Sequence, residues 1–321
     1  MILQIAGMYM EIQCDERVES HLPNLKPFVA TSLPEDESPV CIFQTGQAID
    51  EEATEPTLTS VSDDKTIRLW LKPEVCKLSL HISSLGRTFW LQADREWKEV
   101  FTDWKPESSP LYPYLDDFIM IAFVYSSAFH HTATIHASSV AIGHQGCAFI
   151  GPSGIGKSTH SRLWLEHVPE TRLLNDDQPV LRLQPDGTVC IYGSPWSGKT
   201  DCFRNEGVKL KTLFFMQQSQ KNEITRLTPL ETFQGLMKAA SIIGRDTVTF
   251  KAISHTLASV SGVVPACLFK NQPTPEAVGM SYQAFFQLSL INDQSDKTVK
   301  NELYKFISLD FVYIVCRMYL L

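Results

Sequence analysis

The sequence predicts a mixed α/β (α+β) fold, in which a smaller, mostly antiparallel β-rich domain precedes a larger core of strands and helices. Three observations support this prediction. The 321 residues are 44% apolar and 20% charged, which is typical of a globular chain long enough for two domains. The first part alternates short strand-like runs with turns. The later part mixes helical periodicity with short apolar runs around a glycine-rich loop.

Residues 1–112 are predicted to form the β-rich domain. Its candidate strands are rich in β-branched and aromatic residues and are separated by Pro, Asp, Gly and Ser clusters. They cover 8–13, 40–44, 66–71, 77–82, 87–92 and 98–102. The segments 50–57 and 60–65 are acidic or polar and are predicted to be loops. This domain shows no chemical motif, so we expect it to serve packing and oligomer contacts.

Residues 113–290 are predicted to form the core domain. A helix should begin near Pro113 and cover 114–129, with Asp116 and Asp117 complementing its dipole rather than binding metal. Further predicted helices cover 158–167, 230–240, 250–260 and 275–288. Predicted strands cover 134–141, 147–150, 172–175, 209–216 and 264–269, with a hairpin of 181–183 and 189–192 around a Pro-Asp-Gly turn. Residues 291–321 form a C-terminal tail that sequence patterns do not assign to an element.

The stretch GPSGIGKSTH at 151–160 fits the phosphate-loop (P-loop, Walker A) pattern G-x-x-x-x-G-K-[ST]. An apolar strand-like run precedes it and a helix-like segment follows, as the motif requires. Backbone N–H groups of such a loop converge on a phosphate, Lys157 reaches the β- and γ-phosphates, and Ser158 ligates Mg²⁺. The alternative is a Gly/Ser turn with an incidental lysine. The predicted ATP-binding residues are Gly151, Pro152, Ser153, Gly154, Ile155, Gly156, Lys157, Ser158 and Thr159.

Two adjacent carboxylates, Asp176 and Asp177, end the apolar run LLNDD. If this strand runs parallel to the one before the phosphate loop, its end lies at the same edge of the sheet. One aspartate can then bind Mg²⁺ and the other can accept a proton from an attacking hydroxyl, and we assign Asp176 to the metal and Asp177 to the base. The alternative is an aspartate pair that only caps a turn. His136 lies in IHASSVAIG and is a candidate metal ligand or proton carrier.

A second Gly/Ser/Lys loop, GSPWSGKTDCFR, begins at Gly193 and does not fit the phosphate-loop pattern. Its Ser197, Lys199 and Arg204 could hold an anionic substrate or the transferred phosphoryl group. A plain surface loop is an equal alternative. Trp196 could equally be a core residue or a platform for substrate.

Together these motifs resemble the superfamily that unites HPr kinase/phosphorylase with phosphoenolpyruvate carboxykinase. His136 lies fifteen positions before Gly151, as in HPr kinases, and LLNDD is similar to the Asp pair of both families. The resemblance covers about residues 130–200. It implies an ATP-binding core of HPr kinase/PEP carboxykinase type, with Mg²⁺ (or Mn²⁺) as metal, one Asp linked to the metal and the other acting as base toward a serine. In carboxykinases the aligned histidine helps to bind a second metal.

The chain also departs from both families. It has no equivalent of the segment that supports phosphorylase activity in HPr kinases, and Ala137 replaces the glycine that follows their histidine. It is much shorter than a carboxykinase, and no matching substrate arginines are evident. The acceptor therefore stays open between a protein, a peptide and a small molecule.

The net charge of −8 and the pI near 5.6 argue against a general nucleic-acid-binding surface. The longest apolar run, near 118–129, is too short to span a bilayer, and the N-terminal stretch lacks the basic region of a signal peptide. Scattered cysteines without paired spacing indicate free thiols, which favours a cytoplasmic protein. They are Cys14, Cys41, Cys76, Cys147, Cys190, Cys202, Cys267 and Cys316.

The sequence thus favours a Mg-ATP-dependent kinase that phosphorylates a hydroxyl group of an unknown acceptor. Catalysis would rest on Asp177, Lys157 and His136. Two alternatives stay open: a nucleotide-binding regulatory module without turnover, and a carboxykinase-like lyase. The oligomers formed by HPr kinases suggest a homo-oligomer, and neither nucleic acid nor membrane is expected as a partner.

Overall fold

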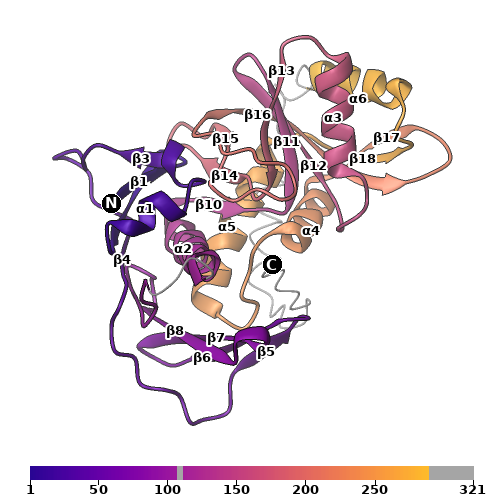
Figure 1. Cartoon of the computed structure of the whole chain (residues 1–321). Helices are drawn as coiled ribbons and strands as arrows, with labels where there is room; N and C mark the ends of the chain where they lie inside the picture. The colour runs from indigo at the N-terminus through magenta and orange to yellow at the C-terminus, as the bar shows by residue number, and fades with distance from the viewer. Residues whose placement is uncertain (107–110, 289–321) are drawn as a thin grey trace. The chain divides into compact units, whose positions relative to one another are not determined.

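The computed structural model describes residues 1–106 and 111–288, so the predicted tail 291–321 lies outside the described residues (Figure 1). The chain divides into two compact units. The first contains Met1–His130 and Ile243–Lys251, and the second contains His131–Ile242 and residues 252–288. The predicted mixed α/β class is confirmed, because the chain forms two large sheets together with several helices.

The described part of the first unit holds a nine-stranded, mostly antiparallel sheet with the strand order β3-β1-β2-β4-β9-β8-β7-β6-β5. Only the pairs β2–β4 and β4–β9 are parallel within this sheet. The strands are β1 (Ile2–Ile5), β2 (Met8–Gln13), β3 (Val29–Ala30), β4 (Cys41–Gln44), β5 (Leu58–Val61), β6 (Lys65–Leu71), β7 (Val75–Ile82), β8 (Arg87–Asp94) and β9 (Glu99–Thr102). The shorter helical segments are α1 (Arg17–His21), η1 (Lys26–Phe28), η2 (Ser83–Leu85) and η4 (Ala128–His130).

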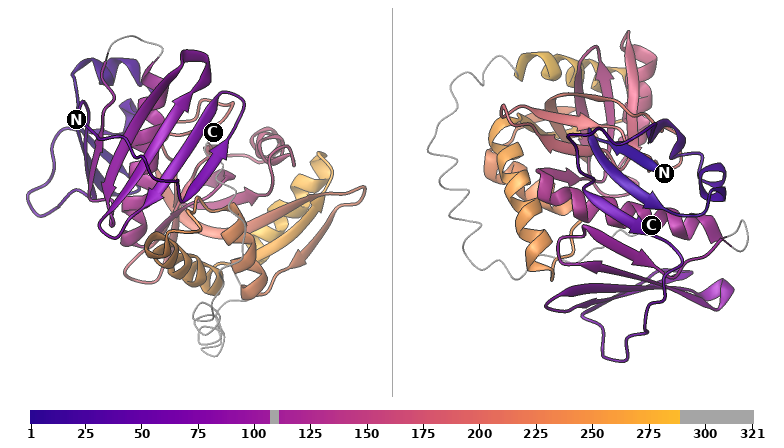
Figure 2. Two further views of the ribbon diagram at one scale, coloured as in Figure 1. Left: turned by 90° about the horizontal axis from the view of Figure 1, so that it is seen from below. Right: turned by 90° about the vertical axis from the view of Figure 1, so that its left-hand side faces the viewer.

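The long helix α2 (Tyr112–Ser127) covers one face of this sheet (Figure 2). Tyr114 stacks on Phe89 of β8 at 6.1 Å between ring centroids, and Tyr125 meets Trp97 at 5.0 Å. Most of the helix is buried, and between Phe118 and Tyr125 every position is apolar or aromatic. Asp117 forms an ion pair with Lys65 at 2.7 Å. Asp117 lies beyond the first turn of the helix. It is paired with a lysine side chain and does not act mainly on the helix dipole, as the sequence had suggested.

The second unit is built around another mixed sheet, with the order β10-β14-β15-β16-β12-β11-β13 and with β18 and β17 beyond β16. Antiparallel β14 and β15 confirm the predicted hairpin, and Gly187 of its turn has a φ of 83°, which suits glycine. The strands are β10 (Thr132–Thr134), β11 (Ala137–Ile142), β12 (Gln145–Ile150), β13 (Thr171–Asp177), β14 (Val180–Leu183), β15 (Val189–Tyr192), β16 (Gly207–Gln218), β17 (Glu223–Arg226) and β18 (Ala266–Asn271).

Two helices of this unit, α4 (Pro229–Ala239) and α6 (Pro275–Gln287), begin at capping signals in the sequence, whereas α5 (Thr247–Val263) begins three residues before the predicted position 250. In α4, Thr228 and Glu231 form a capping box and Pro229 occupies the first turn. The Thr274 hydroxyl accepts a hydrogen bond from Ala277 N at the start of α6. A further helix is α3 (Lys157–His167), and α5 passes from the first unit into the second.

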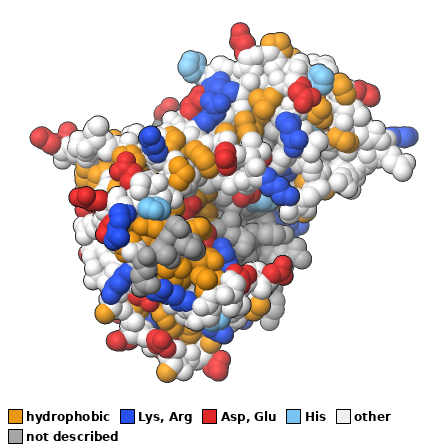
Figure 3. Space-filling model, viewed as in Figure 1, with side chains coloured by type: hydrophobic (Ala, Val, Ile, Leu, Met, Phe, Trp, Pro, Cys, Tyr) orange, Lys and Arg blue, Asp and Glu red, His pale blue; other side chains and the backbone are white. Residues whose placement is uncertain are grey.

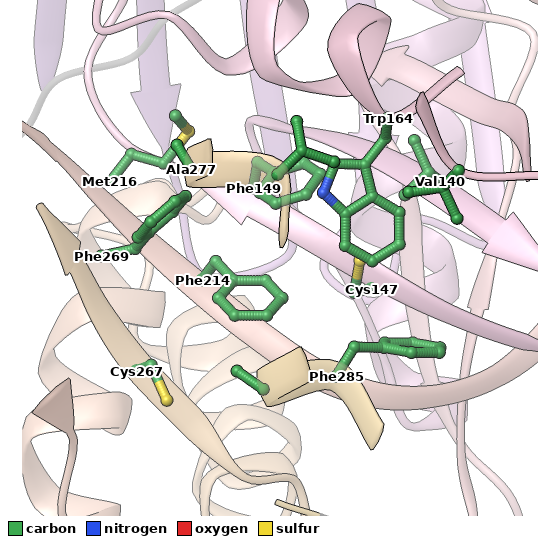
Figure 4. Close-up of a cluster of buried hydrophobic side chains, with 13 residues drawn as sticks. Val140, Cys147, Phe149, Trp164, Phe214, Met216, Cys267, Phe269, Ala277 and Phe285 are labelled. Atoms are coloured by element: carbon green, nitrogen blue, oxygen red, sulfur yellow. The ribbon is translucent and has the colours of Figure 1, made fainter. Parts of the chain in front are cut away.

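An aromatic core joins the second sheet to α3 and α6 (Figure 4). Phe149 of β12 stacks on Phe214 of β16 at 5.5 Å and meets Trp164 of α3 at 5.8 Å. Phe285 of α6 lies edge-on to Trp164 at 5.8 Å. Each of these four side chains is at most 1% exposed, so the core holds β12 and α3 firmly on both sides of the glycine-rich loop.

Two predicted elements need correction, and several strands were not predicted. The predicted strand 134–141 is divided, because β10 pairs with β14 whereas β11 pairs with β12 and β13. The predicted loop 60–65 is partly strand, since β5 extends to Val61. The strands β1, β3, β5 and β17 had no counterpart among the predicted elements.

On the face drawn in Figure 3, acidic and basic side chains are interspersed. Cysteines in the described ranges are free thiols, and most of them are buried, as predicted. No helix in 1–106 or 111–288 is long and apolar enough to cross a membrane.

Candidate active site

The ends of β12 and β13 lie at the same edge of the second sheet. Both strands are antiparallel to β11, which lies between them, so they run in the same direction. The residue pairs Ala137–Ile150 and Ala137–Asp177 bring the start of β11 beside both strand ends. His136 directly precedes this position. The predicted common edge is therefore correct, although the two strands are separated by β11 rather than adjacent.

The glycine-rich loop connects β12 to α3. Gly154 and Gly156 have φ values of 79° and 108°, a left-handed region that L side chains avoid. Residue 156 is the N-cap of α3, so the loop ends at the positive end of the helix dipole. Ser158 is half-buried, and its hydroxyl has no hydrogen-bond partner among the described residues. The loop therefore leads directly into a helix N-terminus, a position at which anions commonly bind in proteins.

The Lys157 ammonium folds back over the loop. Its Nζ donates to the carbonyl oxygens of Gly151 at 2.9 Å and Pro152 at 3.1 Å. It also contacts Nε2 of His136 at 2.9 Å. Burial lowers the pKa of Lys157, and the charges of Asp177 and Asp176 oppose that shift. A cation is thus held at the loop by weak acceptors, which a phosphate oxygen could replace.

His136 connects Lys157 to Asp177. Its Nδ1 lies 2.8 Å from Asp177 Oδ1. If the lysine ammonium donates to Nε2, then Nδ1 carries the ring proton and donates to the carboxylate. The backbone N–H of His136 also donates to Ala239 O at the end of α4, at 2.8 Å. This bond fixes the histidine between the two side chains, so that Asp177, His136 and Lys157 form a continuous chain.

Asp176 is the more buried aspartate of the pair, with 6% of its surface exposed. In the described ranges, no three His, Cys, Asp or Glu residues are grouped closely enough to hold a metal ion by themselves. An oxygen ligand from Asp176 and another from Ser158 nevertheless suit Mg²⁺, which usually keeps waters and phosphate oxygens in its coordination shell.

The second Gly/Ser/Lys loop packs against the Asp pair. Gly198 N donates to Asp176 O at 2.7 Å, and Ser197 forms a β-bridge with Asp177. A Cβ at position 198 would lie 3.0 Å from Asp176 O and 3.5 Å from the Asp177 Cβ. A side chain larger than that of glycine would therefore be tightly packed against Asp176 O at this position. Lys199 follows directly and is exposed.

Asn175 holds this loop in place, a role that sequence reasoning missed. Its Nδ2 donates to Trp196 O at 3.0 Å and to Ser194 Oγ at 3.2 Å, and its Oδ1 accepts from Gln178 N at 2.8 Å. The side chain is fully buried. The sequence does offer one clue: Asn175 follows two leucines in an apolar run. A polar amide that is buried in this way must find hydrogen-bond partners.

The predicted site residues are therefore only partly brought together. His136, Lys157 and Asp177 are in contact, and Ser197 is paired with Asp177. No described contact of Arg204 reaches the Asp pair. Trp196 is 6% exposed, so it is a buried residue of the loop base rather than an open platform.

No protein-family model matches the chain, and no curated protein matches it. Among solved structures, the Hpr(Ser) kinase/phosphatase from Coxiella burnetii aligns with 47% of this chain and 95% of its own, at 15% identity and a TM-score of 0.28. A TM-score this low does not establish a common fold.

Proposed function

We propose that this protein is an ATP- and Mg²⁺-dependent phosphotransferase that transfers the γ-phosphoryl group to a hydroxyl of a protein, peptide or small molecule. The observation that carries the proposal is the contact chain Lys157–His136–Asp177 at the N-terminus of α3. It combines a phosphate-binding cation with a carboxylate base at one sheet edge. The sequence resemblance to HPr kinases agrees with this reading.

The loop residues 151–159 would hold the phosphates, through backbone N–H groups and the dipole of α3. The Lys157 ammonium would exchange the carbonyls of Gly151 and Pro152 for phosphate oxygens. Ser158 and Asp176 are the candidate ligands for Mg²⁺ or Mn²⁺. Bound Mg-ATP supplies the phosphoryl group and the charge of the metal.

Asp177 would accept the proton of the acceptor hydroxyl. His136 donates to its Oδ1 and so leaves the second carboxylate oxygen available for that proton. The histidine acts here as a positioning residue, because its ring orients the carboxylate. Ser197 forms a β-bridge with Asp177, and the exposed Lys199 follows two positions later in the same loop. Both residues would bind an anionic part of the acceptor or of the transferred group.

The test is phosphoryl transfer from γ-labelled ATP to a panel of acceptors: free serine, small hydroxy-metabolites, serine peptides and a cell extract. We expect label on one class of acceptor with Mg²⁺ and none with a chelator. Asp177→Asn should retain ATP binding and lose transfer by at least about a hundredfold, because a general base contributes that much. Lys157→Ala should weaken both binding and transfer.

Matched controls separate these effects from a change of charge. Glu166→Gln alters an exposed carboxylate on α3, and Lys209→Ala alters an exposed lysine on β16. Both variants should bind ATP and transfer the phosphoryl group as the wild type does. Bound ATP without any transfer would favour a regulatory nucleotide-binding module. If calorimetry detects no ATP binding, the phosphate-loop assignment is wrong.

A further inference from the structure

The first unit contains an open cleft of about 380 Å³ that the proposed phosphotransferase chemistry does not use. It lies on the face of β6, β7 and β8 opposite to α2. Phe89 points toward α2, and its neighbours Thr88 and Trp90 point into the cleft, because side chains alternate along a strand. The segment 50–57 passes over this face and forms the other wall (Figure 1).

The floor of the cleft contains unpaired polar groups between two tryptophans. Arg68, Ser79 and Trp90 are directly opposite one another on three neighbouring strands. Trp70 stacks on Trp90 with 5.3 Å between ring centroids. Ser79 is 1% exposed, lines the cleft and forms no side-chain hydrogen bond with another described residue. Its hydroxyl can therefore donate to, or accept from, a ligand that enters the cleft.

The side chain of Arg68 is exposed, lines the cleft and forms no ion pair or hydrogen bond with the described parts of the chain. Its guanidinium lines a cleft whose opposite wall carries glutamates, but none of them neutralises it. Five N–H donors are therefore available at the floor, and they suit carbonyl or carboxylate oxygens of a ligand.

The wall formed by 50–57, called the acidic strap below, is anchored at several points. Trp70 Nε1 donates to Thr54 O at 2.7 Å, and Leu71 N donates to Thr57 Oγ1 at 3.1 Å. Lys72 is hydrogen-bonded to Glu52, which neutralises that carboxylate. These contacts hold the strap over the sheet, so the cleft is a formed feature of the unit.

The acidic strap presents two further carboxylates, Glu51 and Glu55. Both are exposed, line the cleft and form no ion pair with any described residue. Between Asp50 and Pro56 the strap makes no backbone–backbone hydrogen bond within the described chain. Asp50 O, Thr54 O and Thr54 N already have side-chain partners, and the other backbone groups of the strap can pair with another extended chain, as in strand addition.

We infer that this cleft binds an extended peptide segment that carries a basic side chain. The ammonium or guanidinium would lie between Glu51 and Glu55, where the unpaired negative charge exceeds the single positive charge of Arg68. Arg68 and Ser79 would donate to peptide carbonyls, and the edges of the stacked indoles would contact the aliphatic stem. The volume accommodates a few residues rather than a single small cation.

The test uses the full-length protein and fluorescence anisotropy. The probe is a fluorescein-labelled peptide that alternates glycine with lysine and arginine. We expect saturable binding, with a dissociation constant on the order of 10–100 µM. The double variant Glu51→Gln/Glu55→Gln should weaken binding about tenfold or more. The control Glu35→Gln/Glu37→Gln removes the same charge from another exposed loop of this unit and should bind like the wild type.

Several results would overturn the inference. Equal weakening in both double variants would mean that the probe senses only the net charge of the protein. Stronger binding of an acidic probe, or of free spermidine without binding of the peptide, would mean that the cleft selects another ligand. Absence of saturable binding up to about 1 mM probe would also reject it, because such an affinity falls below specific peptide recognition.

Discussion

At the residue scale, a buried polar trio fixes the helix that follows the phosphate loop. The His160 Nε2 lies 3.0 Å from Ser281 Oγ, and Trp164 Nε1 donates to the same hydroxyl at 2.8 Å. The His160 ring also packs edge-on against Phe149 at 4.7 Å. His160 Nδ1 is buried without a partner within the described chain, so the protonated ring would bury an unpaired N–H.

Burial lowers the pKa of His160 to about 4. Since the folded pKa lies below the unfolded value, the stability that the neutral ring contributes is complete above the unfolded pKa of about 6.5 and is lost as the pH falls toward the folded one. Between pH 7 and pH 5.5 this loss amounts to about 1 kcal/mol. Urea unfolding at both pH values should show this decrease in the wild type.

The variant His160→Gln should show a flatter dependence of unfolding free energy on pH. The matched variant His144→Gln changes an exposed histidine and should keep the wild-type dependence. An equal slope in all three proteins would mean that the ring at position 160 gains a proton as easily in the folded state as in the unfolded one.

The residue scale also shows how far the sequence predicts the site. Sequence patterns placed Lys157 and Asp177 just after the ends of two predicted strands. If two strands of a sheet run in the same direction, their ends lie at the same edge, so this common edge was predictable. The contact of Ala239 O with His136 N was not predictable, since it depends on where α4 ends in space. The same holds for Asn175, whose Nδ2 donates to Ser194 Oγ and Trp196 O in a loop that follows about twenty positions later.

At the element scale, two helical glycines should respond in opposite ways to the same substitution. In α6, a Cβ at Gly279 would meet no atom within 4 Å. In α4, a Cβ at Gly235 would lie 2.4 Å from Phe215 Cε1. Inside a helix, alanine stabilises the protein by up to about 1 kcal/mol relative to glycine. Packing around the new methyl group then decides whether each substitution stabilises or destabilises the protein.

We expect Gly279→Ala to stabilise the protein by about 0.5–1 kcal/mol and Gly235→Ala to destabilise it by about 1–3 kcal/mol. Calorimetric melting temperatures of both variants measure this difference, and each serves as the control for the other. A stabilised Gly235→Ala would show that Phe215 can move away without loss of packing.

The elements that the sequence missed share a physical cause. The strands β5 and β17 are short, and the sequences LTSV and EITR lack a continuous apolar alternation. Pairing with β6 and β18 defines them, and backbone hydrogen bonds leave no trace in side-chain patterns. The strands β2, β6 and β7 were predictable because buried and partly exposed residues alternate over much of their length.

At the scale of the whole molecule, the first unit is assembled from distant parts of the chain. Arg95 and Asp246 are 151 positions apart and form an ion pair within this unit. Asp246 is fully buried and also accepts from Thr249 Oγ1 at 2.7 Å at the start of α5. Local sequence patterns cannot reveal such a contact, because neither residue belongs to a motif and only the folded chain brings them together.

This ion pair gives the last prediction. Asp246→Asn should keep the capping contact with Thr249 but leave the Arg95 guanidinium, which is already short of one partner at Nη1, without its counter-charge. Breaking one side of a buried pair typically costs about 3–5 kcal/mol, so urea unfolding of the first unit should shift to clearly lower concentrations. The exposed control Asp63→Asn should unfold like the wild type. The double variant Arg95→Met/Asp246→Asn should recover part of the loss, because it removes the unpaired charge. Equal stability of Asp246→Asn and Asp63→Asn would mean that residues 243–251 are not held to the first unit by this pair.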